Sequence, residues 1–200
     1  MLDAHLRPLI DPPLNRAGIW LSKQGITPNG VTLTGFCFGL IACFLIMQEF
    51  YYSALFFLVL NRLSDGLDGG IARAKGASDF GGFLDICCDF IIYAGFVFSV
   101  ALAQPENTFP ALFLIFSFIG PITSFLAYAI IAEKQRLTTT RQGKKSFYYL
   151  GGLCEGTETF FMLVIICLIP AYFSLIAYTF GGLCWITTIG RVLQAWQDFR

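Results

Sequence analysis

Four aspartates in two closely spaced pairs are the residues of this sequence whose chemistry is most informative. Asp65 and Asp68 form one pair, and Asp85 and Asp89 form the other, within a chain of 200 residues that is 56% hydrophobic. One Asp near the centre of a membrane helix costs about 2.5–3.5 kcal/mol even on the milder insertion scales, so four of them need counter-charges. Oxygen ligands without His or Cys favour a hard cation such as Mg²⁺ or Mn²⁺. The two pairs therefore predict a divalent-metal site.

The residues around the aspartates indicate what such a site would act on. Two ions about 3.5–4 Å apart can clamp a phosphoryl group and stabilise both its attacking and its leaving oxygen. Arg73 can pair with a phosphate through two parallel hydrogen bonds. Small residues let a large anionic substrate approach the backbone closely, and these are Gly66, Gly69, Gly70, Ala72, Gly81 and Gly82. The pattern predicts two ions and a phosphate-bearing substrate.

Helical periodicity brings each pair of aspartates onto one face. At about 100° per residue, Asp65 and Asp68 are about 60° apart around one helix, and Asp85 and Asp89 are about 40° apart around the next. With a rise of about 1.5 Å per residue, all four lie toward the cytoplasmic side of a hydrocarbon core roughly 30 Å thick. We expect them to meet in a shallow pocket that opens to the cytoplasm.

The composition is that of a polytopic membrane protein. Only 13% of the residues are charged, the net charge is zero and the mean hydropathy is +0.68, so neither a soluble domain nor a nucleic-acid partner is expected. The seven cysteines are odd in number and include no C-x-x-C pair, which argues against a disulfide or zinc framework. We expect an all-α fold with six transmembrane helices, each about 20 residues long. The expected spans are 30–48, 51–73, 80–103, 109–132, 148–169 and 172–195.

The distribution of positive charge predicts the orientation of these spans. The connections around Gln48, at 104–107 and at Pro170 contain no Lys or Arg, whereas the termini and the other loops are rich in both. The positive-inside rule therefore places both termini in the cytoplasm. We expect an integral protein of the plasma (inner) membrane whose active site faces the cytoplasm.

The first 24 residues differ from the rest of the chain. Residues 1–24 mix apolar and charged side chains, and Pro8, Pro12 and Pro13 are expected to interrupt any long helix there. An interfacial segment on the cytoplasmic leaflet fits this pattern. No internal repeat or linker divides the chain, so residues 1–200 are expected to form one domain, with the six-helix bundle at 30–195.

The aspartates and their neighbours resemble the signature of the CDP-alcohol phosphotransferase family. The strings DGLDGGIAR and GGFLDICCD match the pattern D-x-x-D-G-x-x-A-R, a spacer, then G-x-x-x-D-x-x-x-D. All eight fixed positions are present: Asp65, Asp68, Gly69, Ala72, Arg73, Gly81, Asp85 and Asp89. Seven residues separate Arg73 from Gly81, one fewer than the resemblance leads us to expect.

The resemblance implies a function and a set of roles. Such an enzyme transfers a phosphatidyl-type group from a CDP-linked lipid in the membrane to a polar alcohol, releases CMP, and often forms a homodimer. Asp65, Asp68 and Asp85 would hold the metals, and Asp89 would deprotonate the acceptor hydroxyl while also touching a metal. The residues expected to contact the donor, with the segment 27–32 on its cytidine side, are Pro28, Asn29, Gly30, Val31, Gly69, Ala72, Arg73, Ser78 and Gly81.

A second group of charged residues lies at the start of the fifth expected span. Glu155 and Glu158 would share one helix face, where they could recognise the acceptor or only bond neighbouring hydroxyl groups. Lys144 and Lys145 could hold a phosphate on the acceptor, although topology alone also explains positive residues there. The acceptor alcohol and the donor's hydrocarbon type stay open.

Three other interpretations compete with the transferase. The aspartates could form structural ion pairs with Arg62 and Arg73, but two cations cannot satisfy four carboxylates. The spacings Asn61-x-x-x-Asp65 and Asp85-x-x-x-Asp89 also resemble the boxes of intramembrane prenyltransferases, which bind a prenyl diphosphate through Mg²⁺. A cation or proton pathway is the non-enzymatic alternative, but it would need polar residues in the outer halves of the first three spans.

Overall fold

Helices make up almost all of the described part of the chain in this computed structural model, which covers residues 2–135 and 152–200, with side chains from residue 10 onward. Within those ranges there is no β-strand. The helices are α1 (Leu2–Lys23), α2 (Pro28–Met47), α3 (Tyr51–Lys75), α4 (Asp79–Ala103), α5 (Thr108–Lys134), α6 (Gly156–Leu168) and α7 (Phe173–Asp198). Short 3₁₀ turns, η1 (Pro105–Asn107) and η2 (Pro170–Tyr172), precede α5 and α7.

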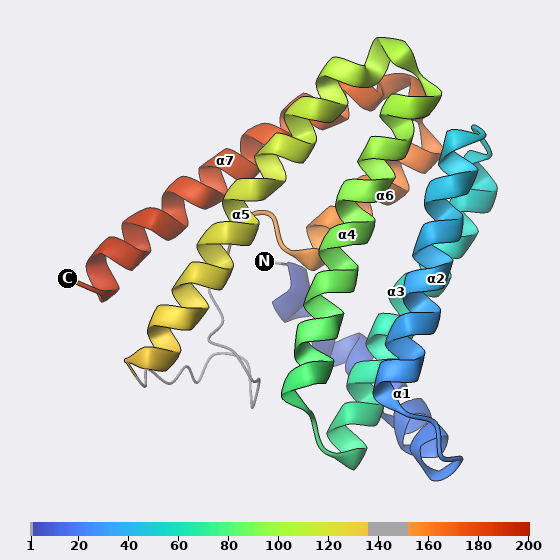
Figure 1. The fold of residues 1–200 in the computed structure, drawn as a ribbon, viewed down its shortest axis with the longest axis vertical. Coiled ribbons are helices and arrows are strands. Elements are labelled where there is room, and N and C mark those ends of the chain that lie inside the picture. Colours follow the sequence, from blue (N-terminus) through green and yellow to red (C-terminus); the bar gives the residue numbers. More distant parts are fainter. Residues whose placement is uncertain (1, 136–151) are drawn as a thin grey trace.

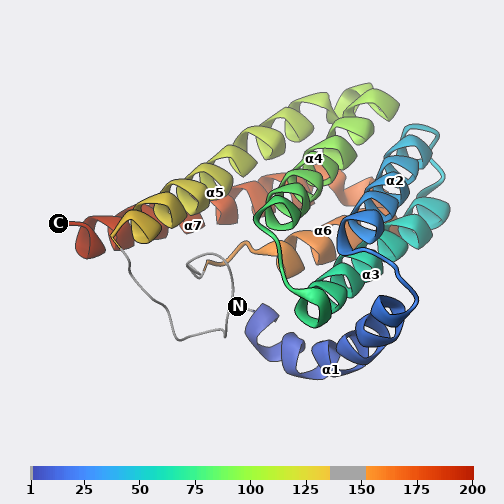
Figure 2. The ribbon, with the colours of Figure 1, turned by 60° about the horizontal axis from the view of Figure 1, so that its bottom comes forward.

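The helices form a bundle with one extended pair. α2, α3, α4 and α6 lie beside one another, while α5 and α7 run together away from them toward the C-terminus (Figure 1). α1 packs against α3 and crosses its C-terminal half (Figure 2). A shared core joins the bundle, and its fully buried members include Leu58, Phe96, Leu114, Leu163 and Phe173, each from a different helix.

The structure confirms that the chain has the helices of a membrane protein. In the ranges that the structure describes, four helical stretches are long and apolar enough to cross a bilayer. They are Pro28–Met47, Asp79–Ala103, Pro105–Lys134 and Pro170–Asp198. α3 occupies the second expected position but carries Arg62, Asp65 and Asp68, and α6 has only 13 residues. The chain is therefore an integral membrane protein with an all-helical fold.

Two sequence-based expectations about helix boundaries are wrong. The fifth span does not start at 148, because residues 152–155 are not helical and α6 begins at Gly156, where Glu155 caps it. The prolines at 8, 12 and 13 do not interrupt α1, which is assigned as one helix of 22 residues. A proline removes one backbone donor and bends a helix, and α1 is indeed curved (Figure 2).

Helix caps at one end of the bundle position the residues of the site. The side chain of Thr27 accepts a hydrogen bond from the Gly30 amide and starts α2, with Pro28 in its first turn. Ser78 caps α4 in the same way by accepting from the Gly81 amide. Between α3 and α4 the chain turns at Gly76, whose φ of 101° favours glycine. The two capped helix starts therefore flank the C-terminal end of α3.

A close contact between α2 and α3 fixes their register. A Cβ on Gly35 would lie 2.7 Å from Cβ of Ser64, so only glycine lets the helices approach this closely. At the same level the buried Asn61 donates a hydrogen bond of 2.9 Å to the Gly35 carbonyl. This contact brings Thr32, one turn earlier in α2, against Asp68.

Candidate active site

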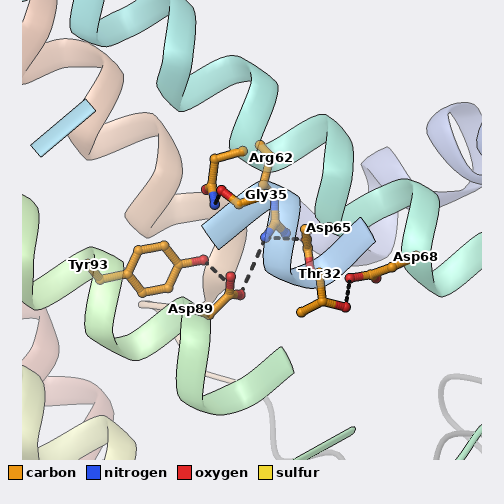
Figure 3. Close-up of polar contacts among 8 residues, drawn as sticks. Thr32, Gly35, Arg62, Asp65, Asp68, Asp89 and Tyr93 are labelled. Carbon is orange, nitrogen blue, oxygen red and sulfur yellow. Dashed lines mark hydrogen bonds and ion pairs between the residues drawn. The ribbon is translucent and has the colours of Figure 1, made fainter. Parts of the chain in front are cut away.

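Three of the four predicted aspartates converge. Asp65 and Asp68 project from α3 and Asp85 projects from α4, and one carboxylate oxygen of each lies within 4.8 Å of the others. Asp68 is buried, and the Thr32 hydroxyl donates a short hydrogen bond to it (Figure 3). These three residues are hereafter called the aspartate triad. Their hard oxygen donors and mutual distances suit one divalent cation such as Mg²⁺ or Mn²⁺.

Asp89 lies beside the triad with partners of its own. The Tyr93 hydroxyl, one helical turn further along α4, donates a hydrogen bond of 3.2 Å to Oδ2 of Asp89. The Arg62 guanidinium lies 3.6 Å from the same oxygen and 2.6 Å from Oδ2 of Asp65 (Figure 3). Arg62 thus links the two helices at the boundary between Asp89 and the triad.

These ion pairs leave most of the negative charge uncompensated. Arg62 pairs with two carboxylates, whereas Nε of Arg73 donates to Asn15. Across the part of the chain that the structure describes, no Lys or Arg pairs with Asp68 or Asp85. One guanidinium against four carboxylates does not make a closed structural network, so the site retains a strong affinity for added positive charge.

The expected donor-binding residues surround one small cavity next to the triad. Its volume is about 130 Å³. Six of the nine expected residues line it, together with Asp68 and Asp85: Pro28, Asn29, Gly69, Ala72, Ser78 and Gly81. Gly30 and Val31 share the first turn of α2 but are not among its lining residues, and Arg73 lines a different cavity. The shorter spacer still brings Ser78 to this cavity.

Two further cavities meet the triad from other directions. One cavity, of about 260 Å³, is lined by Asp89, Arg62 and Tyr93 and also by Glu155 and Arg191. The third cavity, of 470 Å³, lies between α1, α3 and α6, and its apolar wall consists of Ile10, Leu14, Val59, Leu63, Phe160 and Phe161. Asp85 borders all three cavities.

The two glutamates have a structural task. Glu155 precedes α6 as its N-cap, and the backbone amide of Glu155 donates to Oε2 of Glu158 at 3.2 Å in a capping box. Glu155 also accepts from the Gly152 amide at 2.8 Å. The expectation that both acids lie on one face inside a span is therefore wrong for Glu155. Lys144 and Lys145 lie outside the described residues.

Sequence reasoning missed several residues of the site. Tyr93 lies four residues after Asp89, a spacing that could have identified it as a helical neighbour. Arg191 of α7 is 6% exposed, and its NH1 donates to the Pro121 carbonyl at 2.8 Å. Its position in the cavity depends on the pairing of α5 with α7, which no local pattern indicates.

Fold and site together define a class of protein. Apolar helices hold an acidic centre suited to divalent ions, beside a glycine-lined cavity and an apolar cavity. This combination is typical of a membrane-embedded phosphotransferase that acts on a lipid.

Comparison with known proteins gives the family. Residues 25–193 match the family described as CDP-alcohol phosphatidyltransferase. The chain is 49% identical to Inner membrane protein YnjF of Escherichia coli (strain K12), covering 100% of this chain and 98% of that protein. It is 31% identical to archaetidylinositol phosphate synthase of Pyrococcus horikoshii, covering 96% of this chain and 95% of that protein.

Solved structures show the same fold. Mycobacterium tuberculosis phosphatidylinositol phosphate synthase (PgsA1) with CDP-DAG bound has a TM-score of 0.70 at 19% identity, covering 92% of this chain and 93% of that chain. The same enzyme in complex with manganese and citrate gives a TM-score of 0.70 at 20% identity, covering 92% and 88%.

The chain belongs to the CDP-alcohol phosphatidyltransferase family. It is therefore a transferase of phospholipid synthesis that moves a phosphatidyl-type group from a CDP-linked lipid, as the resemblance in its sequence implied. This assignment decides against the prenyl diphosphate and ion-pathway alternatives.

Proposed function

We propose that the acceptor of this transferase is a small polyol that carries a phosphate, and that it binds in the cavity lined by Asp89, Arg62 and Arg191. The observation that carries the proposal is the position of Arg191. Arg191 is buried, and it lines the same cavity as Asp89, although most of the surface of that cavity is apolar. An arginine is the residue best suited to bind a phosphate in such a place. The name of the archaeal relative, archaetidylinositol phosphate synthase, points to the same acceptor class.

The donor would occupy the other two cavities. The CDP moiety fits the small cavity at the capped starts of α2 and α4, where Pro28, Asn29 and Ser78 lie. The lipid chains fit the apolar cavity between α1, α3 and α6. Both cavities reach Asp85, so the diphosphate linkage would lie at the aspartate triad. The relative PgsA1 was solved with CDP-DAG bound, which supports this class of donor.

The residues present fit the metal ions that this chemistry needs. We assign one Mg²⁺ or Mn²⁺ to the aspartate triad and a second to the triad together with Asp89. When bound, the ions neutralise the charge on the diphosphate oxygens. The relative PgsA1 was solved in complex with manganese.

We propose that Asp89 acts as the general base. Its Oδ2 contacts Tyr93 and Arg62, and the residue lines the proposed acceptor cavity, so it could take the proton of an acceptor hydroxyl. The hydroxyl oxygen then forms a bond to the lipid-side phosphorus. The bond from that phosphorus to the bridging oxygen breaks, and CMP leaves with the electron pair. Because CMP is a good leaving group, positioning and charge neutralisation carry most of the catalysis.

We also propose the orientation of the protein in the membrane. The six helices α2 to α7 would all span the bilayer of the inner membrane, with α1 at the cytoplasmic surface and both termini in the cytoplasm. Supports are the lysine- and arginine-free connections, the four long apolar helices and the name of the relative Inner membrane protein YnjF. The donor nucleotide and the acceptor would then enter from the cytoplasm.

CMP release tests the acceptor. Purified protein with Mn²⁺ and CDP-diacylglycerol should release CMP with inositol phosphate or glycerol phosphate, and much less with inositol, glycerol or serine. Arg191→Gln should raise the KM for the phosphorylated acceptor by at least about tenfold, because a charged hydrogen bond is worth about 1.5–3 kcal/mol, and leave the KM for the donor unchanged. Arg200→Gln, near the end of α7, is the matched control. Equal turnover of an unphosphorylated alcohol would overturn the proposal.

A further inference from the structure

α1 forms a wall of the donor site although it precedes the region that matches the family. The match begins at residue 25, whereas α1 ends at Lys23. Three α1 residues, Ile10, Asp11 and Leu14, nevertheless line the apolar cavity that also contains Asp68, Asp85 and Arg73. The position of α1 therefore bears on the geometry of the site.

Close packing locks α1 onto α3. A Cβ on Gly18 would lie 2.5 Å from the backbone carbon of Gly70, and a Cβ on Gly70 would lie 2.8 Å from the Leu14 carbonyl oxygen. Because both contacts involve backbone atoms, they cannot be relieved by a side-chain rotation. These contacts lie one turn of α3 before Arg73. Lys75 strengthens this end by donating to the Ile26 carbonyl at 2.8 Å.

One side chain of α1 contacts the expected phosphate-binding residue. Oδ1 of Asn15 accepts a hydrogen bond of 2.7 Å from Nε of Arg73. The guanidinium lies over Gly69, where an added Cβ would be 3.3 Å from NH1. Nε of Arg73 is thus bonded to Asn15, which fixes the orientation of the guanidinium beside Gly69. Arg73 lines the same cavity as Asp68.

We propose that Asn15 is a positioning residue for donor binding, which acts by orienting Arg73 toward the diphosphate of the CDP-linked lipid. This inference rests on the proposed donor site. Arginine has a long, flexible side chain, and fixing it before binding lowers the entropic cost of each phosphate contact. Neither composition nor the signature strings point to Asn15, because it lies in another helix, 58 residues away from Arg73.

A double-mutant cycle with CDP as the probe tests the proposal. CDP binding in the presence of Mn²⁺ is measured by calorimetry on the full chain in detergent micelles. Asn15→Ala should weaken binding about tenfold, as expected for a lost hydrogen bond to a charged group. Asn15→Asp, which keeps an acceptor oxygen at the same place, should stay within about threefold of the unaltered protein. In an Arg73→Ala background, Asn15→Ala should have no further effect.

Controls separate positioning from folding. Ser22→Ala changes a partly exposed α1 residue whose hydroxyl donates to the Ile19 carbonyl within its own helix, and this variant should bind CDP normally. All variants should elute as the unaltered protein does in size-exclusion chromatography. An equal loss from Asn15→Ala with and without Arg73, or no loss at all, would overturn the inference alone. Failure of the unaltered protein to bind CDP would overturn the proposed donor site as well.

Discussion

At the scale of single residues, the site divides its four carboxylates between two tasks. The aspartate triad gathers oxygens around one point, whereas Asp89 is turned toward Tyr93 and Arg62. Among the residues that the structure describes, the triad alone brings three carboxylates close enough together for a cation site. Asp85, which belongs to the triad, and Asp89, which does not, lie one helical turn apart on α4 and so offer a direct comparison.

Asp85→Asn and Asp89→Asn should therefore differ in metal binding. Asp85→Asn should weaken Mn²⁺ binding by on the order of 100-fold. Loss of a residue that only supports a metal ligand already costs about 10–100-fold, and Asp85 would be a ligand itself. Asp89→Asn should keep most of that binding but abolish CMP release, because it removes the proposed general base. Titration followed by electron paramagnetic resonance measures the first effect, and a CMP assay measures the second. Asp79→Asn, an exposed acid in the first turn of α4, is the control. Equal Mn²⁺ loss in both variants would contradict this division.

Removal of the Arg62 guanidinium should increase the repulsion between the carboxylates of the site. Its guanidinium pairs with Asp65 and Asp89, so Arg62→Gln leaves two neighbouring carboxylates without a cation. We expect a loss of roughly 2 kcal/mol in stability, below the range for fully buried pairs because all three side chains keep some exposure. Thermal unfolding in chelator should show the loss, and added Mn²⁺ should restore part of it. The exposed Arg16→Gln should do neither. A loss that Mn²⁺ leaves unchanged would show that Arg62 acts by packing alone.

At this scale the sequence was informative where the contacts are local. The spacing of the aspartates predicted their convergence, since residues three or four apart share a helix face. The hydroxyl of Thr32 on Asp68 and the link from Arg62 to Asp89 were not predicted, because each joins two helices whose relative rotation depends on packing.

At the scale of elements, hydropathy located the helices and caps set their ends. Observed and expected boundaries agree within three residues everywhere except at the start of α6. The predicted span began at 148 because of the apolar and aromatic residues there, although the sequence also contains a helix-start signal further on. Glu155 and Glu158 have the spacing of a capping box, and the structure shows both of its hydrogen bonds. For α1 the prolines predicted an interruption, whereas the helix continues through them with a bend (Figure 2).

The capping box leads to a prediction that separates the two interpretations of Glu158. Glutamine can accept the same bond from the Glu155 amide, so Glu158→Gln should retain both stability and turnover. Glu158→Ala should lose about 1 kcal/mol of stability, the usual cost of a lost cap. Thermal unfolding and CMP release are compared for both variants. If Glu158→Gln lost turnover at unchanged stability, a direct contact with the acceptor would be indicated instead.

At the scale of the whole molecule, the proposed topology can be tested with inserted tags. Protease sites added before Met1 and after Arg200 should be cut in inside-out vesicles and protected in right-side-out vesicles. A site inserted in η1, at Pro105–Asn107, should behave in the opposite way. The reason is that positive residues cluster in the termini and in the loops on their side. A C-terminal site that is protected in inside-out vesicles would contradict the proposed cytoplasmic C-terminus, and different results for the two termini would contradict an even number of spans.

The meeting of three cavities at Asp85 also has a kinetic consequence. In the proposed arrangement, donor and acceptor occupy different cavities that adjoin at one carboxylate, so both can be bound at the same time. Direct transfer within such a ternary complex requires no covalent enzyme intermediate. A covalent intermediate would instead give ping-pong kinetics. Double-reciprocal plots at several fixed acceptor concentrations should therefore intersect, and parallel lines would rule out simultaneous occupancy.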